Sequence, residues 1–218
     1  MVRSFSILLF ILLFSFVSYS QDKSFVDFIP KDYDTLDGGV AKGDLNKDGI
    51  DDVVLALYHK MENEDVTNID TDSIPSRKLI ILFGSKTGYV LVAETSSALL
   101  CKHCGGINFD PFTGIEIRKN ILIIDHYGGA IWRWGYTHKF RFQNGMFYLI
   151  GETKFSFLSV EHCDNLNEMA GTSYEDINFV TGQFERKRIS EDCKLLEDKK
   201  GRQKVGPLKP LSKFTIEN

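Results

Sequence analysis

The apolar positions of this chain follow a strand pattern rather than a helix pattern. Short apolar or alternating runs recur along the chain, separated by Gly, Asn and Asp. No long segment keeps the 3.6-residue period of an amphipathic helix, so helices should be few and short. We therefore predict a mainly β protein, an antiparallel meander that forms a twisted sheet or a sandwich. A parallel sheet would need crossover helices, and the pattern offers none.

Turn signals divide these runs into hairpins. The continuous apolar run at residues 79–83 predicts a strand covered on both faces, with 89–93 as its antiparallel partner. Asn144-Gly145 between strand-like residues is the strongest hairpin signal in the chain. The other predicted strands are 40–44, 52–58, 115–117, 121–124, 132–142, 146–150, 177–180 and 184–188.

Three segments are predicted to lie outside this β framework. Residues 1–20 combine a basic start at Arg3, an apolar core and small residues at the end, which is the pattern of a secretory signal peptide. Its apolar core is too short to span a bilayer, so we expect no transmembrane segment after cleavage. Residues 21–218 then form a single β-rich domain. Within it, 59–77 lacks an apolar period and is predicted to be an exposed loop, and a polar tail begins at about residue 199.

Charge and cysteine content narrow the class of protein. The chain of 218 residues has 26 basic and 30 acidic side chains, a formal net charge of −4. That balance speaks against nucleic acid as a partner. Four cysteines behind a signal peptide indicate disulfides. We expect an exported protein in the periplasm, on the cell surface or in the medium.

An acidic loop at residues 44–52 is the strongest chemical signal. Oxygen-bearing residues recur at alternate positions, and Gly49 supplies the turn that a β-carbon would resist. Oxygen ligands from carboxylates, an amide and a backbone carbonyl at this alternate spacing suit Ca²⁺. The alternative is an acidic turn without metal, because Asn, Asp and Gly also form turns. The predicted Ca²⁺ ligands are Asp44, Asn46, Asp48, the backbone carbonyl of Ile50, and Asp52.

The loop matches only the first half of an EF-hand. Its twelfth position is Leu55 rather than a bidentate Glu, and a strand follows instead of a helix. Residues 38–58 instead resemble the FG-GAP and VCBS-type calcium repeats of extracellular proteins, which place Asp-x-Asp/Asn-x-Asp-Gly-x-x-Asp between two strands. The resemblance implies a calcium loop that clamps a hairpin. Those families usually stack several repeats as propeller blades, whereas this chain has one.

The cysteines allow structural and reactive interpretations. Four cysteines have three pairings, of which we favour Cys101 with Cys104 and Cys163 with Cys193. The Cys-Lys-His-Cys pair could also be redox-active, but Gly105-Gly106 after it does not predict the helix that thioredoxin-like chemistry needs. A zinc site would need two further ligands, for which His126 and His162 are the candidates. Structural disulfides are therefore the favoured interpretation.

A second group of candidate binding residues lies at residues 101–134. Glycine pairs allow close backbone approach, and tryptophans beside an arginine can stack on planar or sugar-like groups. The interpretation we favour for the tryptophans is that both fill the core with Arg133 opposite in solvent, and a structural histidine is favoured over a catalytic base. The candidate ligand-binding residues are Asp110, His126, Tyr127, Trp132, Arg133 and Trp134.

The same segment resembles a group of uncharacterised exported bacterial proteins. The shared motifs are Cys-Gly-Gly, Asp-Pro-Phe and His-Tyr-Gly-Gly-x-x-Trp-Arg-Trp. The resemblance spans most of the mature chain and implies that residues 101–134 form one unit. It implies no activity.

The sequence favours a binding module over an enzyme. It has no Gly-x-Ser-x-Gly elbow, no His-Glu-x-x-His motif and no phosphate-binding glycine loop followed by Lys. We predict an exported calcium-binding β domain, a non-enzymatic interaction or adhesion-type module whose partner is a glycan or a cell-surface protein. The alternative is an extracytoplasmic hydrolase or thiol redox protein that uses the 101–134 region.

Overall fold

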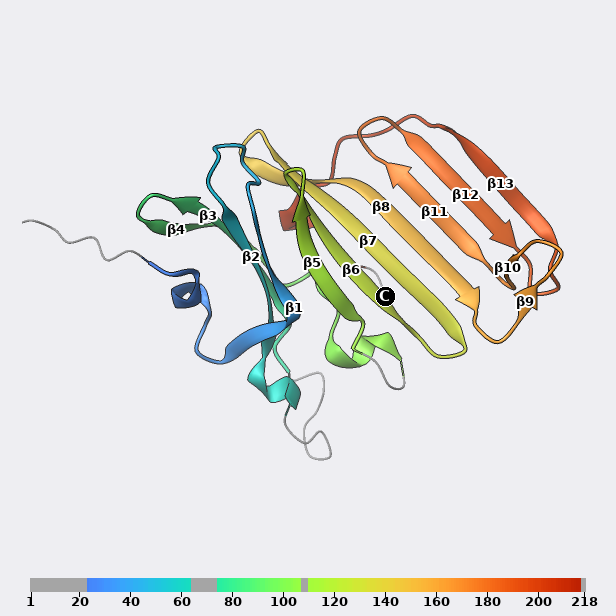
Figure 1. The fold of residues 1–218 in the computed structure, drawn as a ribbon, viewed down its shortest axis with the longest axis horizontal. Helices are drawn as coiled ribbons and strands as arrows, with labels where there is room; N and C mark the ends of the chain where they lie inside the picture. Colours follow the sequence, from blue (N-terminus) through green and yellow to red (C-terminus); the bar gives the residue numbers. More distant parts are fainter. Residues whose placement is uncertain (1–22, 64–73, 107–109, 217–218) are drawn as a thin grey trace, which may run out of the picture.

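Two antiparallel sheets and a small ribbon make up the fold (Figure 1). The computed structural model describes residues 23–63, 74–106 and 110–216, so the predicted signal peptide lies outside the described residues. The four-stranded sheet has the order β1-β2-β3-β4, with β1 Tyr33–Gly43, β2 Asp52–His59, β3 Lys78–Ser85 and β4 Gly88–Thr95.

The second sheet has seven strands in the order β13-β12-β11-β8-β7-β6-β5. Its strands are β5 Phe112–Arg118, β6 Ile121–Gly129, β7 Trp132–Gln143, β8 Met146–Leu158, β11 Ser173–Asn178, β12 Gln183–Ile189 and β13 Leu195–Arg202. The ribbon pairs β9 His162–Cys163 with β10 Glu168–Met169. The described helices are single 3₁₀ turns: η1 Phe25–Phe28, η2 Lys60–Asn63, η5 Lys102–Gly105 and η6 Leu211–Lys213. The predicted antiparallel, mainly β fold with short helices is confirmed.

Local turn chemistry accounts for the meander. Lys119 and Asn120 between β5 and β6 both have positive φ, and so do Asn144 and Gly145 between β7 and β8. Two-residue turns with positive φ at both positions match the right-handed twist of the flanking strands. Consecutive strands therefore pair as neighbours, and the sheet grows in chain order.

The main core lies between the two sheets. The four-stranded sheet contributes Val54, Leu79 and Ile81, and the seven-stranded sheet contributes Leu122 and Phe140. The opposite face of β2 and β3 is covered by the N-terminal segment that contains η1. β3 is therefore buried on both faces over residues 79–82, as its continuous apolar run predicts. In Figure 1 the four-stranded sheet faces the β5–β7 side, while β11, β12 and β13 extend beyond it.

Residues 203–216 form a segment that we call the C-terminal strap. It runs from β13 back to the four-stranded sheet and is anchored by backbone hydrogen bonds of Gln203 to Gly182, of Leu149 to Lys209, and of Ile216 to Ser97. The polar tail predicted from about residue 199 thus begins inside β13. The strap also buries Leu211 and Phe214 in the main core. The strap also holds Val205, Leu208 and Ile216, but its apolar residues alternate with prolines and lysines and match neither a strand nor a long helix, which is why the sequence did not predict this packing.

The predicted exposed loop 59–77 has a buried charged side chain near each end, contrary to the prediction. Residues 64–73 lie outside the described residues, but Glu62 and Arg77 are buried. These two side chains pair with each other, and the ion pair allows charged groups into the interior. No helix among the described residues is long and apolar enough to cross a membrane.

Candidate functional site

The side chain of Asp44 curls the acidic loop between β1 and β2. Its Oδ1 accepts a hydrogen bond from the backbone N–H of Lys47 at 2.5 Å, and its Oδ2 accepts one from Gly49 at 3.1 Å. Lys47 and Gly49 have φ of 69° and 83°, the left-handed conformation that a tight turn requires. The backbone of the loop therefore bends around the first predicted calcium ligand.

The next two predicted ligands repeat this arrangement. Asn46 Oδ1 accepts from the backbone N–H of Asp48 at 2.9 Å, and Asp48 Oδ1 accepts from that of Ile50 at 2.8 Å. The amide of Asn46 also donates to Asp48 Oδ2 at 2.9 Å, so these two side chains lie together. Each oxygen retains lone-pair capacity beyond one backbone bond. The loop thus gathers oxygen atoms of the kind that Ca²⁺ binds.

Asp52 differs from the other acids because it is fully buried. Its Oδ2 accepts from the backbone N–H of Leu45 at 2.7 Å, and its Oδ1 accepts from Gly84 in β3 at 3.0 Å. Burial raises the pKa of Asp52 and outweighs these backbone hydrogen bonds, which act in the opposite direction. Asp52 therefore ties the loop to the sheet. Over the described residues, no three His, Cys, Asp or Glu side chains gather as a metal cluster.

Both favoured disulfides are present. Cys101 pairs with Cys104 and Cys163 pairs with Cys193, so the described cysteines are all oxidised. Cys101 immediately precedes the 3₁₀ turn η5, and the residues described after this turn form no α-helix. Cys101 is exposed, whereas Cys163 is buried in a small cluster that joins the ribbon to the end of β12.

Arg77 is the centre of a buried polar network that the sequence did not reveal. Its guanidinium, 2 % exposed, donates to both carboxylate oxygens of Glu62 through Nε and Nη2, at 2.8–3.1 Å. Nη1 and Nη2 donate to Asp110 at 2.7 and 2.6 Å, and Nη1 also donates to the carbonyl of Leu100 at 3.0 Å. Burial opposes the charge, but the two carboxylates outweigh it and raise the pKa of Arg77. Asp110, a predicted ligand-binding residue, is thus a partner of this arginine.

His126 lies beside this network and is also buried. Its Nε2 accepts a hydrogen bond from the backbone N–H of Leu100 at 3.3 Å. Burial is the largest cause that lowers the pKa of His126 to about 3, and electrostatic interactions with His138 and Arg77 act in the same direction. The imidazole is therefore neutral under physiological conditions.

The other predicted ligand-binding residues lie on opposite faces of the seven-stranded sheet. The register pairs His126 with Tyr136 on the inner face, the same face as Trp134, and pairs Tyr127 with Gly135 on the outer face. Neighbouring residues of a strand point to opposite faces, so the alternation itself could have predicted this split. The six candidates therefore do not form one site.

The favoured prediction that both tryptophans fill the core is wrong. Trp132 is 43 % exposed and its ring lies against Gly171, where a β-carbon would be only 2.4 Å from the indole. Trp134 is half-buried and stacks on Tyr136, with ring centroids 5.1 Å apart. Both lie toward the end of β7 that the four-stranded sheet does not cover, which explains their exposure.

The outer face carries a small aromatic surface. The Tyr127 and Phe155 rings are 6.1 Å apart, Phe155 stacks on Phe157, and the Arg133 guanidinium lies 6.0 Å from the Tyr127 ring centroid. Gly135 makes this possible, because a β-carbon there would be 2.3 Å from the Phe155 ring. This surface has the glycine, aromatic and arginine character predicted for the segment, but it takes Phe155 and Phe157 from β8.

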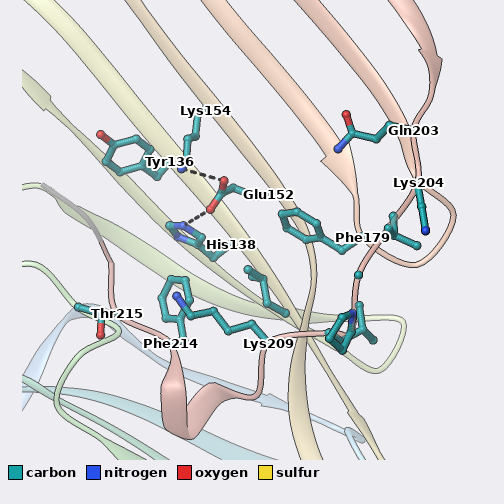
Figure 2. Close-up of a pocket in the computed structure, with 15 residues that line it drawn as sticks. Tyr136, His138, Glu152, Lys154, Phe179, Gln203, Lys204, Lys209, Phe214 and Thr215 are labelled. Carbon is teal, nitrogen blue, oxygen red and sulfur yellow. Dashed lines mark hydrogen bonds and ion pairs between the residues drawn. The ribbon is translucent and has the colours of Figure 1, made fainter.

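A further cavity, of about 400 Å³, lies between the inner face of β7 and β8 and the C-terminal strap (Figure 2). His138 Nε2 and Glu152 Oε2 are 3.0 Å apart, and Lys154 Nζ lies 2.9 Å from Glu152 Oε1. The ring of Phe214, from the strap, packs edge-on against His138 with centroids 4.8 Å apart. The sequence gives no signal for this cavity, since its walls come from segments far apart in the chain.

Comparisons of the chain with family models, with curated proteins and with solved structures returned no match. The fold and its bonds define the class: an antiparallel β protein with a four-stranded sheet packed on part of a seven-stranded meander, and two disulfides.

Proposed function

We propose that this chain is an exported calcium-binding β domain that acts as a non-enzymatic interaction module. The observation that carries the proposal is the curl of the acidic loop, in which Asp44, Asn46 and Asp48 bend the backbone around themselves. The resemblance of residues 38–58 to FG-GAP and VCBS-type loops supports the same ion. The two disulfides are typical of proteins in oxidising compartments and support export.

Calcium would act on the stability of the four-stranded sheet. The predicted ligands include three carboxylates within nine residues, whose mutual repulsion a divalent cation relieves. Asp44 follows the last residue of β1 and Asp52 is the first residue of β2, while Asp52 also binds the backbone of β3. A calcium ion that neutralises the carboxylates of the loop would therefore help to hold β1, β2 and β3 in register. Its role in this proposal is structural.

Calcium is expected to raise the melting temperature of the protein, and chelator to lower it. At free calcium about 100 times the dissociation constant, binding stabilises the folded state by about 2.7 kcal/mol. Asp48→Ala should remove most of this response because it deletes a predicted ligand. Asp51→Ala is the matched control, since it removes the same charge from a neighbouring exposed position outside the predicted ligand set. Thermal melts that are unchanged by chelator and by Asp48→Ala would rule out the calcium site.

The aromatic surface of Tyr127, Phe155 and Phe157 with Arg133 is the proposed contact for a glycan or cell-surface protein. Aromatic faces beside a guanidinium suit sugar rings and planar groups. Oligosaccharide titrations can be followed by calorimetry and, as a second signal, by the fluorescence of Trp132 and Trp134, which flank Arg133 on β7 but face the other side of the sheet. A flat response across a broad panel, also seen by calorimetry, removes the glycan as partner.

The exposure of Cys101 favours one alternative, a thiol redox function. We expect the Cys101–Cys104 bond to be reduced before Cys163–Cys193, because the attacking thiolate must reach a sulfur and Cys163 is buried. Alkylation and mass spectrometry over a series of dithiol concentrations measure the order. Reduction of Cys101–Cys104 only under conditions that also open Cys163–Cys193 contradicts this alternative and leaves two structural disulfides.

A further inference from the structure

The cavity beneath the C-terminal strap is built from two layers of the fold. Its inner wall is the face of β7 and β8 that the four-stranded sheet leaves uncovered, and its outer wall is the strap itself. A volume of about 400 Å³ lies in the range of pockets that hold small organic molecules. The strap is anchored by hydrogen bonds at both ends and in the middle, so these walls are held in place.

Most of the cavity wall is apolar. The sheet contributes Leu149, the β11–β12 turn contributes Phe179, and the strap contributes Val205, Leu208 and Phe214. Figure 2 shows the rings of Phe179 and Phe214 on different sides of the space. Such walls favour an apolar body, because its transfer out of water into an apolar environment is favourable.

One end of the cavity is polar. His138 is buried and its Nε2 lies in hydrogen-bond contact with Glu152, but its Nδ1 is a buried atom with no hydrogen-bond partner among the described residues. Burial opposes ionisation of Glu152, yet its bonds to His138 and Lys154 outweigh it and lower its pKa.

The charges around the cavity favour an anion. Lys154, Lys204 and Lys209 line it, against the single carboxylate of Glu152. Lys154 reaches the polar end from the sheet, while Lys209 extends from the strap with its ammonium 5.6 Å from the Phe214 ring centroid. The excess of positive charge lies beside an apolar wall, where an ionic contact is stronger than in open water.

We propose that this cavity binds a small organic anion, a carboxylate or sulfonate with an apolar ring or chain. The apolar body lies between Phe179 and Phe214, and the anionic group contacts Lys209. This site is separate from the acidic loop and from the outer aromatic surface. It needs neither calcium nor a partner of the interaction module.

The anionic dye 1-anilinonaphthalene-8-sulfonate is the probe for the first test. We expect saturable binding with enhanced, blue-shifted fluorescence at one dye per protein. Lys209→Glu should weaken the affinity about tenfold or more, because it replaces a charge-assisted contact by a repulsion. Lys213→Glu is the matched control: it makes the same charge change on the same strap, at an exposed position outside the cavity, and should alter the affinity less than about twofold.

Two further measurements keep the test decisive. Leu208→Trp, which fills the cavity, should abolish dye binding while near-ultraviolet circular dichroism and the melting temperature show a folded protein. In competition, 3-phenylpropionate should displace the dye, whereas its uncharged amide should not. Absence of dye binding to the folded protein, or equal affinities of the Lys209→Glu and Lys213→Glu variants, overturns the proposal. Equal displacement by the acid and the amide overturns the assignment of an anion.

Discussion

Replacing Arg77 by methionine is expected to destabilise the protein by about 3–5 kcal/mol, because the change leaves a buried carboxylate without its partner. Glu62 is only 5 % exposed and receives three hydrogen bonds from the guanidinium. Asp110 would also lose its ion pair, although its side chain is 35 % exposed and can be hydrated. Urea unfolding, followed by circular dichroism, measures the loss.

Lys78→Met is the control for this prediction. The residue is adjacent in sequence and loses the same charge, but its ion pair with Glu94 is partly exposed. Such pairs contribute roughly 0–1 kcal/mol. A double variant, Arg77→Met with Glu62→Leu, should recover much of the loss because it removes the orphaned charge. Equal destabilisation by Arg77→Met and Lys78→Met would show that the buried network is not formed in solution.

Acidification from pH 6.5 to about pH 3 is expected to remove roughly 4–5 kcal/mol of stability through His126. Its pKa is lowered from 6.5 to about 3 in the folded protein, with burial as the largest cause. Below pH 6.5 the unfolded chain therefore binds a proton that the folded chain does not. The contribution of His126 is fully present above pH 6.5 and is lost progressively as the pH falls toward 3.

The measurement is the slope of unfolding free energy against pH for three proteins. His126→Gln keeps a side-chain acceptor for the Leu100 N–H and cannot take up the proton, so its slope should be shallower than that of the wild type. His103→Gln, which changes an exposed histidine on η5, should leave the slope unchanged. The comparison remains valid if His126→Gln lowers stability at every pH, since the slope carries the prediction. Identical slopes for all three proteins contradict it.

Local patterns predicted the strands well because the determinants are neighbours in sequence. The positive-φ pair Asn144-Gly145 sets the longest hairpin, and the uninterrupted apolar run in β3 predicts burial on both faces. The acidic loop is local in the same sense. The hydrogen bonds of the Asp44, Asn46 and Asp48 side chains reach no more than five residues along the chain.

The buried polar groups could not be predicted in this way. Arg77 stands in a polar stretch that the pattern marks as exposed, and its partners Glu62 and Asp110 are 15 and 33 residues away. Charged residues enter an interior only when paired, and a single sequence does not reveal which distant residues will pair. The positions of the two tryptophans are a similar case. Their exposure depends on where the four-stranded sheet stops covering β7.

By itself, the sequence determined the antiparallel meander, the curled acidic loop and the strong tendency toward disulfides, since each follows from turn geometry, side-chain alternation or residue type over a short span. Only the tertiary structure decided how the disulfides pair, which face each candidate ligand-binding residue occupies, and that the C-terminal strap encloses a cavity against β7 and β8. The physical reason is that these features depend on the packing of layers, in which side chains far apart in the chain exclude water together.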